Sequence, residues 1–183
     1  AMEDSSRDAK RFQYERFILS QLLVMALKGV PAFYLPALLA SENDIKSFSM
    51  TGQRRDLNRE KFKSENLSAV LNNPESNANK NLKYLRNAMD VRSELKQFHP
   101  CSEMKCLSKG RSDIVVIKRG KGPESVFAIH NMTENKINYQ LNDNDLPKII
   151  DNDFNTHDFL TSTKYNCKNI SLDPFQVIWL SAL

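Results

Sequence analysis

The amino-acid sequence predicts an α/β segment over residues 1–100, followed by a small antiparallel β domain over residues 101–183. The first half carries apolar residues at helical spacing around one short apolar run, Val30 to Tyr34. The second half carries β-branched runs that are bounded by glycine and polar residues. Because the helical spacing gives way to strand patterns after Pro100, we place the boundary between the two parts near residue 100.

The composition is that of an ordinary soluble globular protein. The chain has 183 residues, of which 40% are hydrophobic and 26% charged, enough for one domain or a domain with a small module. The net charge of +4 is modest and spread along the chain, which argues against nucleic-acid binding. No apolar run reaches the ~18 residues that span a bilayer, so no membrane partner is expected.

The chain carries three cysteines, Cys101, Cys106 and Cys167. An odd number, without a secretory signal, indicates reduced thiols and a cytoplasmic protein. The spacing of Cys101 and Cys106 differs from the two-residue gap of zinc-binding pairs. His99, His130 and His157 lie far apart, in settings typical of a helix end, a strand and a loop. We therefore expect no metal site, no cofactor and no catalytic histidine.

Helices are predicted at residues 10–28, 61–72 and 75–98, with short helical turns at 36–40 and 41–48. Val30 to Tyr34 is interpreted as a strand buried on both faces, as in a parallel sheet. The chain supplies no parallel neighbour for it. The sequence is therefore typical of the C-terminal piece of a larger α/β protein, whose missing strands lie upstream or come from a second copy in a dimer.

The β domain is predicted to contain four to six strands. Residues 112–118 and 125–131 form a hairpin, 136–141 a third strand and 175–180 the last one, while Ile149-Ile150 is too short to assign. The only tryptophan, Trp179, lies in the most apolar of these runs. We interpret it as a core residue, with an aromatic platform for sugars as the alternative.

The residues from Arg54 to Lys61 form the one concentration of charge that follows the apolar run. Arg55 could bind a phosphate or a sugar hydroxyl through its planar guanidinium. Spacing alone favours the other interpretation, in which Arg55, Asp56, Arg59 and Glu60 form a surface ion-pair network. Upstream of this cluster, Asn43-Asp44 is interpreted as a helix cap or turn.

Two runs, GVPAFYLPALLASENDI and TGQRRDLNREKF, resemble the end of the catalytic barrel in the sucrose phosphorylase-like enzymes. That group is subfamily 18 of glycoside hydrolase family 13, the α-amylase clan. The resemblance covers roughly residues 10–98. It implies that the chain holds the last strand and helices of a (β/α)8 barrel plus an antiparallel β domain. Residues 30–34 would be the eighth strand and residues 35–74 the loop after it, on the catalytic face.

The resemblance also implies a reaction. In this family, a carboxylate nucleophile and a carboxylic acid cleave a glucoside with retention, and phosphate accepts the glucosyl group. The partners of the full-length parent would be a sugar substrate and inorganic phosphate. The arginine of the Arg-Asp-Leu-Asn-Arg run reaches the bottom of the glucose subsite, paired with a carboxylate from elsewhere in the barrel. Here that residue is Arg55, which would donate a hydrogen bond to a glucose hydroxyl.

The catalytic carboxylates of the family would all lie before residue 1. No carboxylate of this chain, Asp44 and Asp56 included, is therefore expected to be a catalyst. A complete barrel takes ~250 residues, so we expect the chain alone to be inactive. Two alternatives remain: a non-catalytic carbohydrate-binding module and a homo-oligomer in which a second copy covers the unpaired faces.

Overall fold

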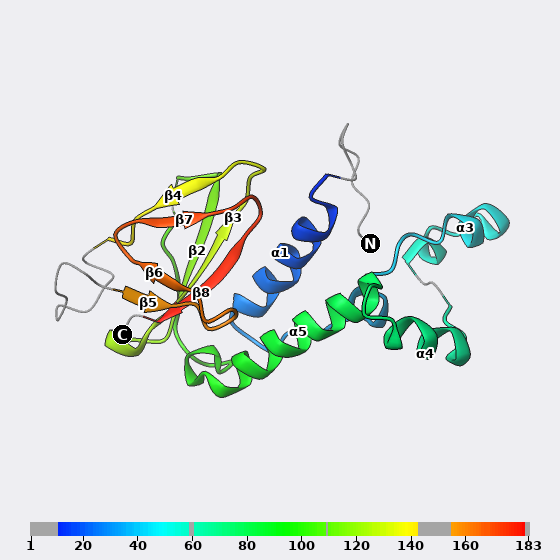
Figure 1. The fold of residues 1–183 in the computed structure, drawn as a ribbon, viewed down its shortest axis with the longest axis horizontal. Coiled ribbons are helices and arrows are strands. Elements are labelled where there is room, and N and C mark those ends of the chain that lie inside the picture. The colour runs from blue at the N-terminus through cyan, green and yellow to red at the C-terminus, as the bar shows by residue number, and fades with distance from the viewer. Residues whose placement is uncertain (1–10, 59–60, 109, 143–154, 182–183) are drawn as a thin grey trace. The chain divides into compact units, whose positions relative to one another are not determined.

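A computed structural model describes residues 11–58, 61–108, 110–142 and 155–181 (Figure 1). The chain divides into two compact units. The helical unit comprises residues 1–18 and 32–87, and the β unit comprises residues 19–31 and 88–183. These units are defined by contacts within the chain and combine segments that are distant in sequence. They do not test the predicted boundary near residue 100, which stays a prediction. Ile149-Ile150 lies outside the described residues.

The regular elements before residue 100 are helices and short 3₁₀ turns in the described part of the chain. The α-helices are α1 (Gln13–Ala26), α2 (Leu35–Leu38), α3 (Ile45–Thr51), α4 (Ser64–Asn72) and α5 (Asn77–Glu94). The short 3₁₀ turns are η1 (Arg54–Asn58), η2 (Lys96–Phe98) and, later in the chain, η3 (Gly122–Glu124). The three predicted long helices are thus confirmed as α1, α4 and α5, each slightly shorter than its apolar pattern.

The β unit is antiparallel throughout its described part. Its strands are β1 (Met104–Cys106), β2 (Ile114–Arg119), β3 (Val126–Asn131), β4 (Ile137–Tyr139), β5 (Asn155–His157), β6 (Lys164–Asn166), β7 (Ile170–Leu172) and β8 (Val177–Ser181). The largest sheet has the order β1-β2-β3-β8, and β4-β7 and β5-β6 form two further pairs. The predicted hairpin is confirmed, since β2 and β3 pair side by side in Figure 1.

The core of the β unit lies between the large sheet and the β4-β7 pair. Its buried members are Ile114, Val116, Phe127, Ile129, Leu141, Cys167, Ile170, Leu172, Ile178 and Leu180. Trp179 is fully buried, opposite Ala128 in the sheet, and its ring centroid lies 4.6 Å from that of Phe98. The interpretation of Trp179 as a core residue is therefore confirmed, and an aromatic platform built on it is wrong.

The predicted strand at Val30–Tyr34 is not formed. These residues lie between α1 and α2 with no strand assignment, and Val30 is 80% exposed and Tyr34 56% exposed. Tyr34 keeps extended backbone angles, φ −81° and ψ 141°. A strand exists only as part of a hydrogen-bonded pair, and the described residues offer this run no partner strand. The sequence encodes the extended conformation, but the neighbours that would bury it are not among these residues.

The C-terminal end of α1 is held by two arginines of the β unit. Arg119, which is fully buried, donates from Nη1 to the carbonyl oxygens of Ala26 (2.9 Å) and Leu27 (2.7 Å). Arg92 donates from Nε to Met25 O and from Nη2 to Gly29 O, both at 2.9 Å. The last turn of a helix leaves its carbonyls unpaired and partly negative, so cations are favoured there.

Phe98 supports both guanidinium groups. The guanidinium carbon of Arg119 lies 5.4 Å from the Phe98 ring centroid, and that of Arg92 lies 5.8 Å from it. Arg119 also donates from Nη2 to His99 O at 2.9 Å. Burial, and secondarily the charge of Arg92, lowers the pKa of Arg119 from its usual value. We call Arg92, Arg119 and Phe98 the arginine clamp.

Arg119→Met should destabilise the β unit by ~3 kcal/mol, because it leaves buried carbonyls of α1 and residue 99 without donors. Urea unfolding followed by Trp179 fluorescence measures the loss. Arg86→Met, at an exposed position on α5, is the matched control and should change the unfolding free energy by less than about 0.5 kcal/mol. Equal stability of the two variants would contradict the structural role of the clamp.

Candidate functional site

The segment that carries the predicted site residue begins with a capped helix. Asp44 precedes α3, and its carboxylate accepts hydrogen bonds from Ser47 N (2.8 Å) and Ser47 Oγ (2.5 Å). These bonds hold the pKa of Asp44 below its usual value. At the other end, Gly52 has a left-handed backbone (φ 67°) and donates to Phe48 O at 2.8 Å. The predicted role of Asp44 as a helix cap is confirmed.

The turn η1 is tied back to α3 at two points. Asp44 N donates to Leu57 O at 2.8 Å, and Thr51 Oγ1 donates to Asp56 Oδ2 at 2.5 Å. Both bonds reach the second half of η1, at Leu57 and Asp56, so its backbone there is held by local bonds rather than by burial. The segment from Asp44 to Asn58 therefore presents its remaining side chains from a defined backbone.

Arg55 is the second residue of η1 and is exposed. It makes no hydrogen bond or ion pair with any other described residue, and its neighbour Asp56 bonds to Thr51 instead. Arg55 and Asp56 therefore form no ion pair with each other, and the network predicted for Arg55, Asp56, Arg59 and Glu60 stays a prediction. Arg59 and Glu60, the other members of the predicted ion-pair network, lie outside the described residues. Arg55 stays a predicted sugar-binding residue whose donors are unused within this part of the chain.

Asn81, which is not among the residues predicted from the sequence, positions the loop that leads to α3. Its side chain is fully buried, and Nδ2 donates to Ala37 O (2.9 Å) and Leu38 O (2.8 Å) at the end of α2. The signal that could have revealed it is a polar residue between Ala78 and Leu85, both of which are buried on the same helix. A buried amide at such a position usually bonds backbone carbonyls.

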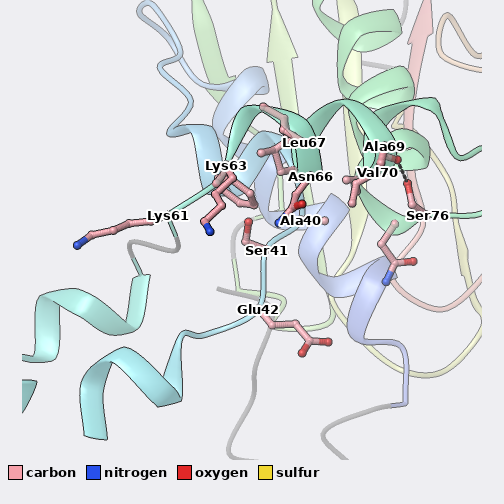
Figure 2. Close-up of a pocket in the computed structure, with 14 residues that line it drawn as sticks. Ala40, Ser41, Glu42, Lys61, Lys63, Asn66, Leu67, Ala69, Val70 and Ser76 are labelled. Carbon is pink, nitrogen blue, oxygen red and sulfur yellow. Dashed lines mark hydrogen bonds between the residues drawn. The ribbon is translucent and has the colours of Figure 1, made fainter. Parts of the chain in front are cut away.

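The helical unit contains a large and a smaller cavity, and Figure 2 shows the large one. It has a volume of about 590 Å³ and is lined by Leu39, Ala40, Ser41, Glu42, Lys61, Phe62, Lys63, Asn66, Leu67, Ala69, Val70, Ser76, Asn77 and Ala78. The smaller, of about 260 Å³, is lined by Phe17, Tyr34, Pro36, Ala37, Ser41, Glu42 and Asn58. Arg55 lines neither cavity. Of the residues in the Arg-Asp-Leu-Asn run, Asn58 lines the smaller of these two cavities, and the others line neither.

No group of three metal-ligating side chains occurs among the described residues. His99 is exposed, and its Nδ1 accepts from Cys101 N at 3.2 Å. His157 belongs to strand β5 rather than to the predicted loop. Cys101 and Cys106 are free and exposed, while burial raises the pKa of the free thiol of Cys167 to about 12. In the described residues, no helix is both long and apolar enough to cross a membrane.

His130 is fully buried in β3. Burial lowers the pKa of its imidazole to about 4, although the nearby carbonyl of Val115, 3.2 Å from Nδ1, acts in the opposite direction. The side chain is therefore neutral at physiological pH and part of the core. It is not available as an acid or base.

The chain is similar to curated enzymes of one kind. It is 31% identical over 130 residues to a glucosylglycerate phosphorylase of Allomeiothermus silvanus, covering 71% of this chain and 23% of that protein. A glucosylglycerate phosphorylase of Escherichia coli is 22% identical over 165 residues, covering 90% of this chain and 28% of that protein. The chain is related to the C-terminal part of the sucrose phosphorylase-like enzymes of glycoside hydrolase family 13. It spans about a quarter of the length of these two relatives. No protein-family model matches it.

Solved structures of the α-amylase family share the fold. Trehalose-6-phosphate hydrolase of Bacillus licheniformis superposes with a TM-score of 0.65 at 16% identity, covering 96% of this chain and 40% of that one. AmyP E221Q in complex with maltotriose gives a TM-score of 0.71 at 14% identity, covering 97% of this chain and 36% of that one. The predicted fold class, an α/β piece from the end of a (β/α)8 barrel plus an antiparallel β domain, is confirmed.

The pH dependence of stability should reveal the buried imidazole of His130. Because its pKa is lowered to about 4 in the folded chain, the unfolded chain takes up the proton first as pH falls. The contribution of His130 to the free energy of unfolding is fully present above pH 6.5, the approximate pKa of histidine in the unfolded chain. As the pH falls from 6.5 to 4, up to ~3 kcal/mol of this contribution is lost. His130→Leu should remove this loss in urea unfolding at pH 7 and pH 4.5.

Asp158 is a second buried group that makes stability depend on pH, and the experiment must separate its effect from that of His130. Burial raises its pKa, so its contribution to the pH dependence has the opposite sign. It is present in both proteins, and the difference between wild type and His130→Leu therefore isolates the imidazole. An identical pH dependence in the two proteins would show that His130 is not buried in its neutral form.

Proposed function

We propose that the chain is the C-terminal part of a retaining glucoside phosphorylase, which transfers a glucosyl group from an α-glucoside to phosphate. The relatives' printed function, glucosylglycerate phosphorylase, supports this reaction class. The share of the relatives that is matched, 23% and 28%, supports a piece of a longer enzyme. The antiparallel domain from residue 101, and a cytoplasmic location, belong to the same proposal.

One observation carries the proposal: the exposed apolar run from Val30 to Tyr34. It is apolar and ends in the extended backbone of Tyr34, yet it has no partner strand among the described residues. In a (β/α)8 barrel, the eighth strand lies between the seventh and the first, and both of its faces are covered. Those neighbours would pair the backbone of this run and bury Val30 and Tyr34. The run therefore has the properties of a barrel strand that lacks the rest of its barrel.

Arg55 is the residue proposed to contact the sugar. A guanidinium offers five N–H donors in a planar array, which suits hydroxyl groups and a paired carboxylate. Arg55 is exposed on an anchored turn, and its donors are unused by the described residues. Asp44 and Asp56 already accept bonds from Ser47 and Thr51. We accordingly assign the nucleophile and the acid to the part of the barrel that would precede residue 1.

Oligomerisation is the second candidate, because a second copy could also cover the exposed run at Val30 to Tyr34. The two candidates differ in what completes the apolar surface, a preceding barrel segment or an identical chain. Sedimentation of the purified chain separates them. A monomer favours the barrel piece, and a stable dimer favours self-association.

The isolated chain should show no phosphorolysis of glucosylglycerate or sucrose, measured as glucose 1-phosphate formed in the presence of inorganic phosphate. The protein extended by the coding region immediately upstream should be active, because the catalytic carboxylates would then be present. The extended protein serves as the positive control. Activity of the isolated chain would contradict the proposal.

In the extended protein, Arg55→Lys should lower kcat/KM for the glucoside by roughly 10- to 100-fold, since a charged hydrogen bond to substrate is lost or misplaced. Arg54→Lys changes the adjacent exposed arginine in the same way and should leave kcat/KM within about twofold. Both variants should unfold at the same urea concentration as wild type. Equal kinetics of the two variants would remove Arg55 from the sugar site.

A further inference from the structure

Strand β4 and the residues after it present three carboxamides on one face. Asn138, Gln140 and Asn142 are exposed and alternate with Tyr139 and Leu141, which pack toward the core. The strand pairing continues past Tyr139, since Leu141 N donates to Cys167 O at 3.1 Å. Because side chains alternate along a strand, the three amides point to the same side.

These amides line a cavity of about 370 Å³ in the β unit. The other lining residues are Leu107, Ser108, Arg111 and Tyr139. This volume is at the low end of the ~300–1,000 Å³ typical of small-molecule sites, which suits one or two sugar rings. We call it the amide cavity. It is separate from the segment that carries Arg55, which belongs to the helical unit.

The charge of the amide cavity is balanced. Arg111 donates from Nε to Asp113 Oδ1 at 2.8 Å and from Nη2 to Asp113 Oδ2, and its guanidinium carbon lies 5.6 Å from the Tyr139 ring centroid. The ion pair lowers the pKa of Asp113, so both partners stay charged near neutral pH. The Asp113 carboxylate offsets the charge that would attract a phosphate. The guanidinium keeps further N–H groups for a neutral ligand.

The side chains of Asn138, Gln140 and Asn142 make no hydrogen bond to another described residue. Each carboxamide offers two donors and one acceptor oxygen, which matches a hydroxyl group that both donates and accepts. A carboxylate or phosphate would use only the donors and would meet the acceptor oxygens unfavourably. The set of three amides beside a neutralised ion pair therefore favours a polyhydroxyl compound over an anion.

We propose that the amide cavity is a second carbohydrate site, which binds a neutral saccharide of one or two rings through Asn138, Gln140 and Arg111. Arg111 covers a face of the Tyr139 ring, so a sugar cannot stack on that face. The contacts with the saccharide are therefore polar. The proposal does not depend on glucosyl transfer. It needs only the β unit, and the fully buried Trp179 has no part in it.

The test is an NMR titration of the full chain, labelled with ¹⁵N, with maltose, glucose and, separately, inorganic phosphate. Maltose or glucose should shift the side-chain amide signals of Asn138, Gln140 and Asn142. Inorganic phosphate should leave these signals unchanged. The double variant Asn138→Ala/Gln140→Ala should bind at least about tenfold more weakly, since two hydrogen bonds are lost. Gln140→Ala alone is the second variant should the double variant unfold.

Asn169→Ala is the matched control, an exposed asparagine of the same unit outside the amide cavity. It should bind maltose as wild type does. The proposal is overturned if neither sugar shifts the three signals, if phosphate shifts them and the sugars do not, or if the variants in the cavity bind sugar as tightly as Asn169→Ala.

Discussion

The arginine clamp at the end of α1 is the interaction on which the β unit depends. Arg92 and Arg119 donate five hydrogen bonds, all to backbone carbonyls, and four of these acceptors lie in residues 25–29. Desolvating two guanidinium groups is costly, and carbonyls compensate only when the geometry is good. Phe98 packs against both cations and against the buried Trp179, so the clamp is linked to strand β8 of the large sheet. A helix distant in sequence thereby becomes part of the β unit.

Most of the secondary structure follows from local patterns. The helices and the β2–β3 hairpin were predictable from local sequence. Apolar residues recur every three to four positions in the helices, and β-branched residues cluster in short runs in the strands. The strand at Val30 to Tyr34 was not, because strand formation depends on a neighbour that local sequence cannot supply. Tyr34 at the end of that run has extended backbone angles, but the run forms no strand. The role of Arg119 could not be predicted either, since two of its three acceptors lie more than ninety residues earlier in the chain.

The candidate site was only partly predictable for a similar reason. The cap at Asp44 follows from a local bond to Ser47 and was recognisable from residue type. Arg55 was identified through a family resemblance, and no local pattern distinguishes it from Arg54 beside it. Asn81 acts on carbonyls more than forty residues away, which no motif reveals. The amide cavity depends on the turn before β2 meeting the end of β4, a product of tertiary folding.

The exposed run at Val30 to Tyr34 also bears on the fate of the chain in a cell. An unpaired apolar segment is a template for intermolecular β-pairing, and proteins normally protect such edges. Here Pro31 lies within the run and Pro36 follows it, and each removes a backbone donor that a growing fibril would need. The prolines would disfavour stacking of many copies while still permitting docking of one complementary strand. The segment thus exposes an apolar surface that a partner strand could cover, while its prolines disfavour aggregation before such a strand binds.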